Sequence, residues 1–170
     1  MTVITYQSAV VWRILKHNRV YRAYPSIKYK KEYAALIDML GLHCVCPVFG
    51  VLPRHKQNTN GKVSSSVRLV LDVPDDRVKL TEYGVWADFI YYYGFSKPDD
   101  YTRLLPDCDE ITQTAYTALL EDLKRQRPVG EYRTPQVVLE EILPEWVTEA
   151  RPMDQLTLLQ RIRQRLGFKL

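Results

Sequence analysis

One segment, residues 67–73, constrains the fold of this chain more than any other. Its apolar residues recur at every second position: Val67, Leu69, Leu71 and Val73. A period of two residues places alternate side chains on opposite faces of an extended strand. The segment therefore predicts a strand with one buried face, and such a strand needs both a pairing neighbour and a covering layer.

Strand and helix patterns are interleaved along the chain rather than segregated. We expect further strands at residues 3–6, 44–51, 78–80 and 136–143, and a turn at 74–76. We expect helices at residues 8–17, 30–40, 84–93, 111–126 and 154–166. Ser8 can cap the first helix, Gly41 can end the second, and Pro144 can end the last strand. This order predicts an α+β fold.

Length and composition fit one soluble domain. A chain of 170 residues with 46% hydrophobic residues can bury a core without disulfides or metals. No run approaches the roughly 18 apolar residues of a membrane span, and residues 1–6 do not resemble a secretory signal. We therefore expect a cytoplasmic protein without membrane contact. We expect residues 1–150 to form the domain, with 151–170 as a basic amphipathic helix packed on it, and residues 54–66 to form a mobile loop.

The cysteines do not indicate a metal or a disulfide. The chain has three, and an odd number gives no disulfide framework. Cys44 and Cys46 lie near His43 and His55, whereas Cys108 stands alone. Structural zinc sites use two cysteine pairs, each with a wider spacing. We expect no metal, and thiols that behave as small apolar groups.

The formal net charge of +4 conceals an uneven distribution. Residues 1–71 hold 11 basic and 2 acidic residues, residues 72–150 hold 8 and 17, and residues 151–170 hold 5 and 1. A basic first segment suits an anionic ligand. The basic and acidic segments can also simply neutralise each other across the fold.

Tyrosines and basic residues are mixed between positions 19 and 33. The basic residues are Arg19, Arg22, Lys28, Lys30 and Lys31, and the tyrosines are Tyr21, Tyr24, Tyr29 and Tyr33. This mixture can stack on bases or nicotinamide and neutralise phosphates. Tyrosines at helical spacing can equally form the edge of a core with wet hydroxyls. Both interpretations stay open.

Four short motifs carry a family resemblance, whereas phosphate loops, nucleophile elbows and dinucleotide fingerprints are absent from the sequence. The motifs are Ile-Thr-Tyr-Gln-Ser at 4–8, Val-Tyr-Arg-Ala-Tyr-Pro at 20–25, strand 67–73 followed by Pro-Asp-Asp, and the segment 134–147. Together they resemble the ADP-ribosyltransferase-like superfamily. They are also similar to uncharacterised bacterial proteins with a Trp-Thr-x-Gln-like opening strand and a Pro-Asp-Asp-x-Val segment ahead of a Trp.

The resemblance implies a split mixed or antiparallel sheet flanked by helices, with NAD as the cofactor. Gln7 falls at the NAD-contacting position of the first strand, and Tyr21 and Tyr33 fall at the two positions that stack on nicotinamide. Gln136 stands where active members carry the catalytic glutamate, which stabilises an oxocarbenium-like state as an amide cannot. Glu140 lies about 13 Å further along the same strand face. It supplies the catalytic carboxylate only if the register of this strand differs from the one that places Gln136 at the catalytic position.

Two hypotheses follow. The first is mono-ADP-ribosyl transfer from NAD or binding of a nucleotide, with a nucleic acid or protein acceptor, in a bacterial or phage toxin or anti-defence role. The alternative is a non-catalytic phage or mobile-element protein that binds nucleic acid or a defence protein through the basic aromatic residues 19–31. The amide at position 136 favours the alternative.

Overall fold

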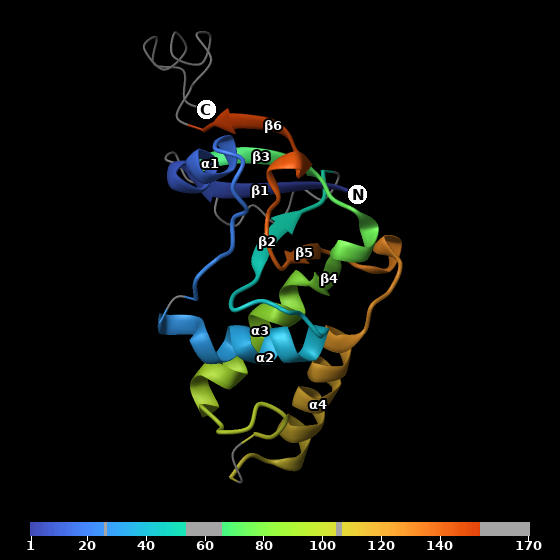
Figure 1. The fold of residues 1–170 in the computed structure, drawn as a ribbon. Coiled ribbons are helices and arrows are strands. Elements are labelled where there is room, and N and C mark those ends of the chain that lie inside the picture. Colours follow the sequence, from blue (N-terminus) through green and yellow to red (C-terminus); the bar gives the residue numbers. More distant parts are fainter. Residues whose placement is uncertain (26, 54–65, 105–106, 154–170) are drawn as a thin grey trace, which may run out of the picture.

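The computed structural model describes residues 1–25, 27–53, 66–104 and 107–153, and within them six strands form one antiparallel sheet (Figure 1). The strand order is β4-β5-β2-β1-β3-β6. The strands are β1 (Thr2–Ser8), β2 (Val48–Val51), β3 (Ser66–Asp72), β4 (Lys79–Glu82), β5 (Pro135–Leu139) and β6 (Val147–Pro152). The predicted α+β fold, with an antiparallel sheet flanked by helices, is confirmed.

The predicted strand at 67–73 lies near one edge of this sheet. It forms β3, which pairs with β1 along its whole length, from Thr2 opposite Asp72 to Ser8 opposite Ser66. The outer neighbour β6 was not predicted, because this edge strand has no fully buried residue and carries little apolar alternation. β6 pairs with β3 across a register irregularity between Val70 and Leu71.

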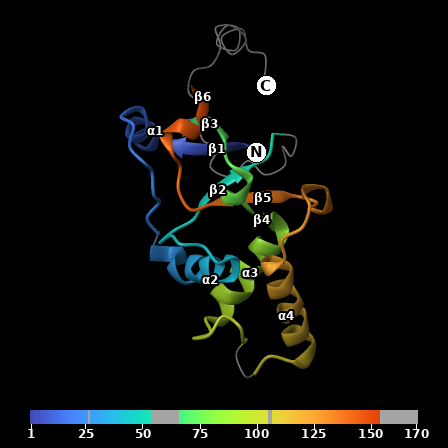
Figure 2. The ribbon, with the colours of Figure 1, turned by 45° about the vertical axis from the view of Figure 1, so that its right-hand side comes forward.

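Four α-helices in the described residues cover the sheet unevenly. They are α1 (Ala9–Lys16), α2 (Lys30–Leu40), α3 (Tyr83–Ser96) and α4 (Glu110–Lys124). In both ribbon views α2, α3 and α4 gather beside the half of the sheet formed by β2, β5 and β4, whereas α1 lies against β1 and β3 (Figures 1 and 2). Helices α2, α3 and α4 therefore form one end of the molecule, and the β1–β3–β6 half with α1 forms the other.

Two apolar clusters lie on opposite faces of the sheet. Val137 and Leu139 of β5 belong to the cluster that includes α1, whereas Val138 between them belongs to the cluster of α2, α3 and α4. Since neighbouring strand residues point to opposite faces, β5 is buried on both sides. In the helical cluster Phe89 and Tyr116 are fully buried, with ring centroids 6.2 Å apart.

The predicted helix signals act as expected. Ser8 caps α1, and its Oγ accepts a hydrogen bond from the Val11 N–H at 3.4 Å. Gly41 ends α2 with a left-handed φ of 61°, a conformation that glycine adopts without strain. The helix predicted at 154–166 lies outside the described residues, as does the loop predicted at 54–66 except for Ser66.

Two predicted strands are shorter than expected for one shared reason. The strand expected from 44 begins only at Val48, because Pro47 has no N–H for the ladder. Val48 pairs with Leu139, so β5 has no β2 partner beyond Leu139. The strand expected to reach 143 therefore ends there, with a bend at Glu140, and Glu140 and Glu141 lie outside the strand.

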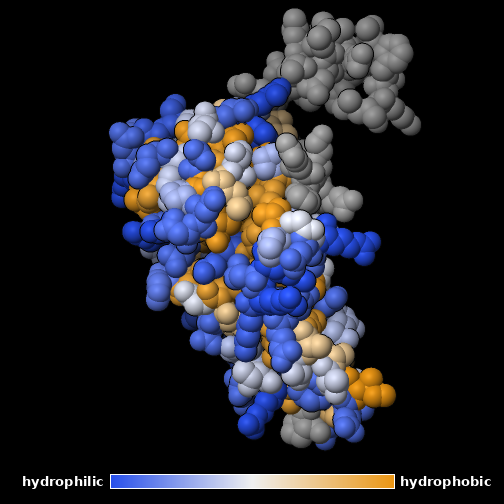
Figure 3. All heavy atoms as spheres, turned by 90° about the vertical axis from the view of Figure 1, so that its right-hand side faces the viewer, coloured by the Kyte–Doolittle hydropathy of each residue, from blue (hydrophilic) through white to orange (hydrophobic). Residues whose placement is uncertain are grey.

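Hydrophobic side chains also reach the surface. In the space-filling view they form patches among hydrophilic residues, both over the sheet and at the helical end (Figure 3). Helices α3 and α4 expose three large apolar side chains, Tyr91, Phe95 and Ile111, at 69%, 83% and 82%. No helix in the described ranges combines the length and apolar character needed to cross a lipid bilayer.

Candidate functional site

Gln136, the predicted catalytic position, is part of the sheet interior. Its side chain is 2% exposed, and its Oε1 accepts a hydrogen bond from Thr81 Oγ1 at 3.5 Å. The adjoining space, bounded also by Val51 and Tyr6, measures about 10 Å³. That volume holds about one water molecule at most, so it does not admit a nucleotide.

Gln7 lies on the other face of the sheet from Gln136. Ile4 pairs with Val51, and Val51 pairs with Gln136, so these three side chains share a face. Gln7 is three residues beyond Ile4 in an unbroken strand and therefore points the opposite way. Its Nε2 donates to Thr5 Oγ1 at 2.7 Å. The structure does not bring the two glutamines together.

The two predicted stacking tyrosines both pack inside the fold. Tyr33 lies against Phe49 and Trp86, with ring centroids at 5.8 and 6.3 Å. Tyr21 exchanges backbone hydrogen bonds of 2.9 Å with Ile142 and packs against the α1-side cluster. Burial raises the pKa of both phenols above the ordinary value. Their rings occupy the positions of core-edge residues.

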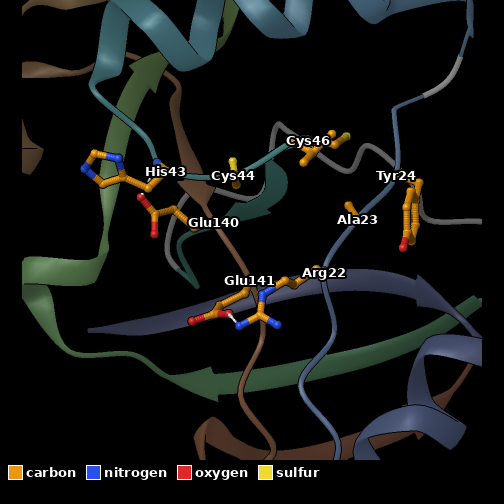
Figure 4. A pocket seen from close by; sticks show the side chains of 9 residues that line it. Arg22, Ala23, Tyr24, His43, Cys44, Cys46, Glu140 and Glu141 are labelled. Carbon is orange, nitrogen blue, oxygen red and sulfur yellow. Dashed lines mark hydrogen bonds and ion pairs between the residues drawn. The ribbon is translucent and has the colours of Figure 1, made fainter.

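Glu140 lines a cavity of about 500 Å³ beyond the end of β5 (Figure 4). The backbone N–H of His43 donates to Glu140 Oε1 at 2.7 Å. The neighbouring Glu141 forms ion pairs with Arg22 at 2.8 Å and with Arg77 at 3.0 Å. Figure 4 shows Arg22 directed at Glu141 from the facing segment. The charges at this cavity are thus largely neutralised among themselves.

The thiols beside that cavity are unreactive in character. Burial, followed by the negative charge of Glu140, raises the pKa of the Cys44 thiol to about 11. Burial raises the pKa of Cys46 as well. A protonated thiol is a poor nucleophile and a poor metal ligand. All three cysteines are free, and in the part of the chain described no group of three metal-ligating side chains is assembled.

A larger cavity, of about 770 Å³, lies between the start of α2 and the end of α3, and we call it the α2–α3 groove. Four lysines line it: Lys28, Lys30, Lys31 and Lys97. Four aromatic residues line it as well: Tyr29, Tyr91, Tyr93 and Phe95. The groove therefore combines positive charge with π surface in one place.

Two rings of the groove are presented to solvent as a pair. Tyr91 and Phe95 lie one helical turn apart on α3, with ring centroids at 6.4 Å and ring planes at 14°. Their inward neighbours Phe89 and Tyr93 stack on each other in the helical core at 5.4 Å. The outer pair is thus a stacked surface on a well-packed helix.

Only part of the predicted basic aromatic surface reaches this groove. Lys28, Lys30 and Lys31 do, whereas Arg22 is at the other cavity and Arg19 lies exposed after α1. The α3 contribution was missed, although residues 91–95 carry a signal for it. Four aromatic residues in that five-residue run cannot all face inward on one helix, so some must be exposed.

No protein-family model, curated protein or solved structure matches this chain.

Proposed function

We propose that this protein binds single-stranded nucleic acid in the α2–α3 groove, as a binding module rather than as an enzyme. The observation that carries the proposal is the exposed ring pair Tyr91 and Phe95 beside four lysines. Aromatic side chains stack on unpaired bases, and lysines neutralise the phosphates between them. Bases in a duplex are already stacked on each other, so the pair favours single strands.

The exposure of these rings supports a binding role. Leaving Tyr91 and Phe95 in water forfeits the free energy that their burial would gain. The lysines around them make the groove electropositive, since Glu32 is its single acidic residue among those described. An anionic partner with flat apolar faces matches the lysines and the exposed rings of the groove. A nucleic acid is such a partner, because it carries charged phosphates and flat bases.

ADP-ribosyl transfer from NAD stays a prediction. The residues implied for it occupy two faces of the sheet, and Glu140 is engaged with His43 and Arg77. A bacterial or phage toxin or anti-defence role likewise stays a prediction. The nucleic-acid interpretation uses a single cavity and three of the residues expected to contact nucleic acid, Lys28, Lys30 and Lys31.

The salt dependence of binding tests the electrostatic part of the proposal. We expect a labelled thymidine oligonucleotide of about nine nucleotides to bind with an affinity that falls linearly with salt on logarithmic axes. Exchanging Lys30 and Lys31 for glutamine should reduce that slope by about 1.4, at roughly 0.7 for each phosphate that is no longer neutralised. Fluorescence anisotropy measures the slope.

Two exposed cations at the other end of the molecule provide the control. Arg13 and Lys16 belong to the last turn of α1, away from the groove. Their exchange for glutamine changes the net charge equally and should leave the slope nearly as in the parent. Equal slopes in both double variants would contradict the proposal, because a diffuse positive surface would then account for the binding.

A further inference from the structure

One side chain in the α2–α3 groove has a role that phosphate binding and stacking do not explain. Glu32 lines the groove, yet the residue is only 9% exposed. Within the described residues, its carboxylate takes part in none of the side-chain hydrogen bonds or ion pairs, although lysines line the same groove. Its oxygens are not among the fully buried side-chain atoms without a partner, so the carboxylate reaches the groove while most of the residue is packed. A carboxylate that has lost most of its surrounding water and accepts no hydrogen bond from the described part of the protein favours a ligand that donates to it.

The surroundings of the carboxylate leave one side open. Its charge contributes to the raised pKa values of Tyr33 and Tyr93, after desolvation, so it lies near both phenols. On another side stands Gly94, where a Cβ would be 3.8 Å from Glu32 Oε1. The bare backbone of Gly94 keeps space in the groove next to the oxygen. Glu32 lies in the first turn of α2, where the helix dipole stabilises its negative charge. The dipole does not provide a side chain that donates a hydrogen bond to the carboxylate.

The chemistry of the missing partner follows from the carboxylate itself. An ionised carboxylate only accepts hydrogen bonds, and its two oxygens suit two donors side by side. The surrounding lysines disfavour a cationic ligand such as an amine. The best ligand is therefore anionic where it meets the lysines and offers paired N–H donors to the carboxylate.

Among the bases of nucleic acids, guanine has this pair of donors. Its Watson–Crick edge presents N1–H next to the 2-amino group. Adenine and cytosine present one amino group beside an acceptor nitrogen, and thymine or uracil presents one N–H between two carbonyl oxygens. Only guanine can donate to both carboxylate oxygens without bringing an acceptor against one of them.

We infer that Glu32 makes the groove specific for guanine, by accepting hydrogen bonds from N1–H and the 2-amino group of an unpaired guanine. This inference rests on the proposed binding of single-stranded nucleic acid and adds its base preference. The stacking rings hold any base, the lysines hold the backbone, and Glu32 selects one base by the pattern of its donors.

The test compares three oligonucleotides on the unmodified chain. They are a thymidine oligonucleotide, the same with one central guanosine, and the same with one central inosine, which keeps N1–H but lacks the 2-amino group. We expect guanosine to raise the affinity about 10-fold or more over thymidine, and inosine to lose most of that gain. Fluorescence anisotropy at constant salt gives the ratios.

The variant Glu32→Gln assigns the preference to this side chain. One carboxylate oxygen becomes an amide NH₂, which opposes a guanine donor, so the guanosine-to-thymidine ratio should fall to near one. Glu121→Gln, at an exposed position of α4, is the matched control and should keep the parent ratio. The ratio is the readout, so a general change in affinity does not affect it.

Each other outcome is decisive. Clear binding with equal affinity for guanosine, inosine and thymidine would overturn the inference and leave the proposed function standing. Absence of binding to all three would overturn the proposed function, and the inference with it. A lower melting temperature of Glu32→Gln with an unchanged ratio would assign Glu32 to the stability of α2 alone. If Glu32→Gln does not fold, the inosine comparison on the parent chain still decides.

Discussion

Gln136→Glu is expected to lower the free energy of unfolding by about 3–5 kcal/mol near pH 8, because it places an uncompensated charge in the sheet interior. Gln136 is 2% exposed, and the cavity beside it measures about 10 Å³. Urea unfolding at two pH values measures the effect. If Gln136 faced an open cleft instead, water would solvate the added carboxylate, and the free energy of unfolding would change little.

The pH dependence of this variant has a defined sign. Burial raises the pKa of a carboxyl above its unfolded value of about 4.3. The folded state then binds more protons than the unfolded state between the two pKa values, so the variant loses stability relative to the parent as pH rises through that window. Below about pH 4 both states are protonated, and the charge-related part of the loss disappears.

Gln113→Glu is the matched control. Gln113 Oε1 accepts a hydrogen bond from the Leu104 N–H at 3.2 Å, and a carboxylate oxygen can accept the same bond. Its effect should stay within about 1 kcal/mol. If Gln136→Glu were as stable as the parent near pH 8 and also released nicotinamide from NAD, the sheet-interior assignment would be wrong and the transferase prediction would gain support.

The double variant Tyr91→Ala with Phe95→Ala is expected to weaken the binding of single-stranded oligonucleotides by about 30-fold or more. Base stacking on an aromatic ring contributes about 1–3 kcal/mol, so two rings contribute at least about 2 kcal/mol together. Both side chains are mostly exposed, at 69% and 83%, so the melting temperature should change little. Fluorescence anisotropy and thermal unfolding separate the two effects.

The control for that variant is Ile111→Ala on α4, which removes a side chain that is equally exposed, at 82%, and lies outside the groove. It should leave the affinity unchanged. A similar loss in both variants would indicate non-specific adhesion to apolar surface. An unchanged affinity of the double variant would remove the rings from the binding site.

The sequence was sufficient for features that depend on neighbouring residues. The alternation at 67–73 predicted β3, and Ser8 and Gly41 predicted an end each of α1 and α2. The ends of strands were not predictable in the same way, because they depend on the neighbouring strands with which they pair. The early end of β5 follows from Pro47 in a different segment, because Pro47 delays the start of the partner strand β2.

In the candidate site, too, local features were predictable from the sequence, whereas features that depend on distant segments were not. The lysines near residue 30 and their tyrosines were recognisable as a basic aromatic mixture. The same pattern did not separate Tyr33, which packs against the edge of the core, from Tyr29, which lines the groove. The other wall comes from α3, some 60 residues later, and only the fold brings it there. The position of the Glu32 carboxylate in the groove was unpredictable because its neighbours Gly94 and Tyr93 belong to that distant wall.

The most direct test of nucleic-acid binding in the α2–α3 groove is photo-crosslinking to an oligonucleotide that carries 5-bromouracil, followed by peptide mass spectrometry. Crosslinking favours aromatic side chains that stack on the base, and the groove presents Tyr29, Tyr91 and Phe95. We predict crosslinks in the peptides that contain these three residues, with loss of the α3 crosslinks in the Tyr91→Ala, Phe95→Ala variant. Crosslinks concentrated at the Arg22–Glu141 cavity or on α1, with none at the groove, would contradict the account.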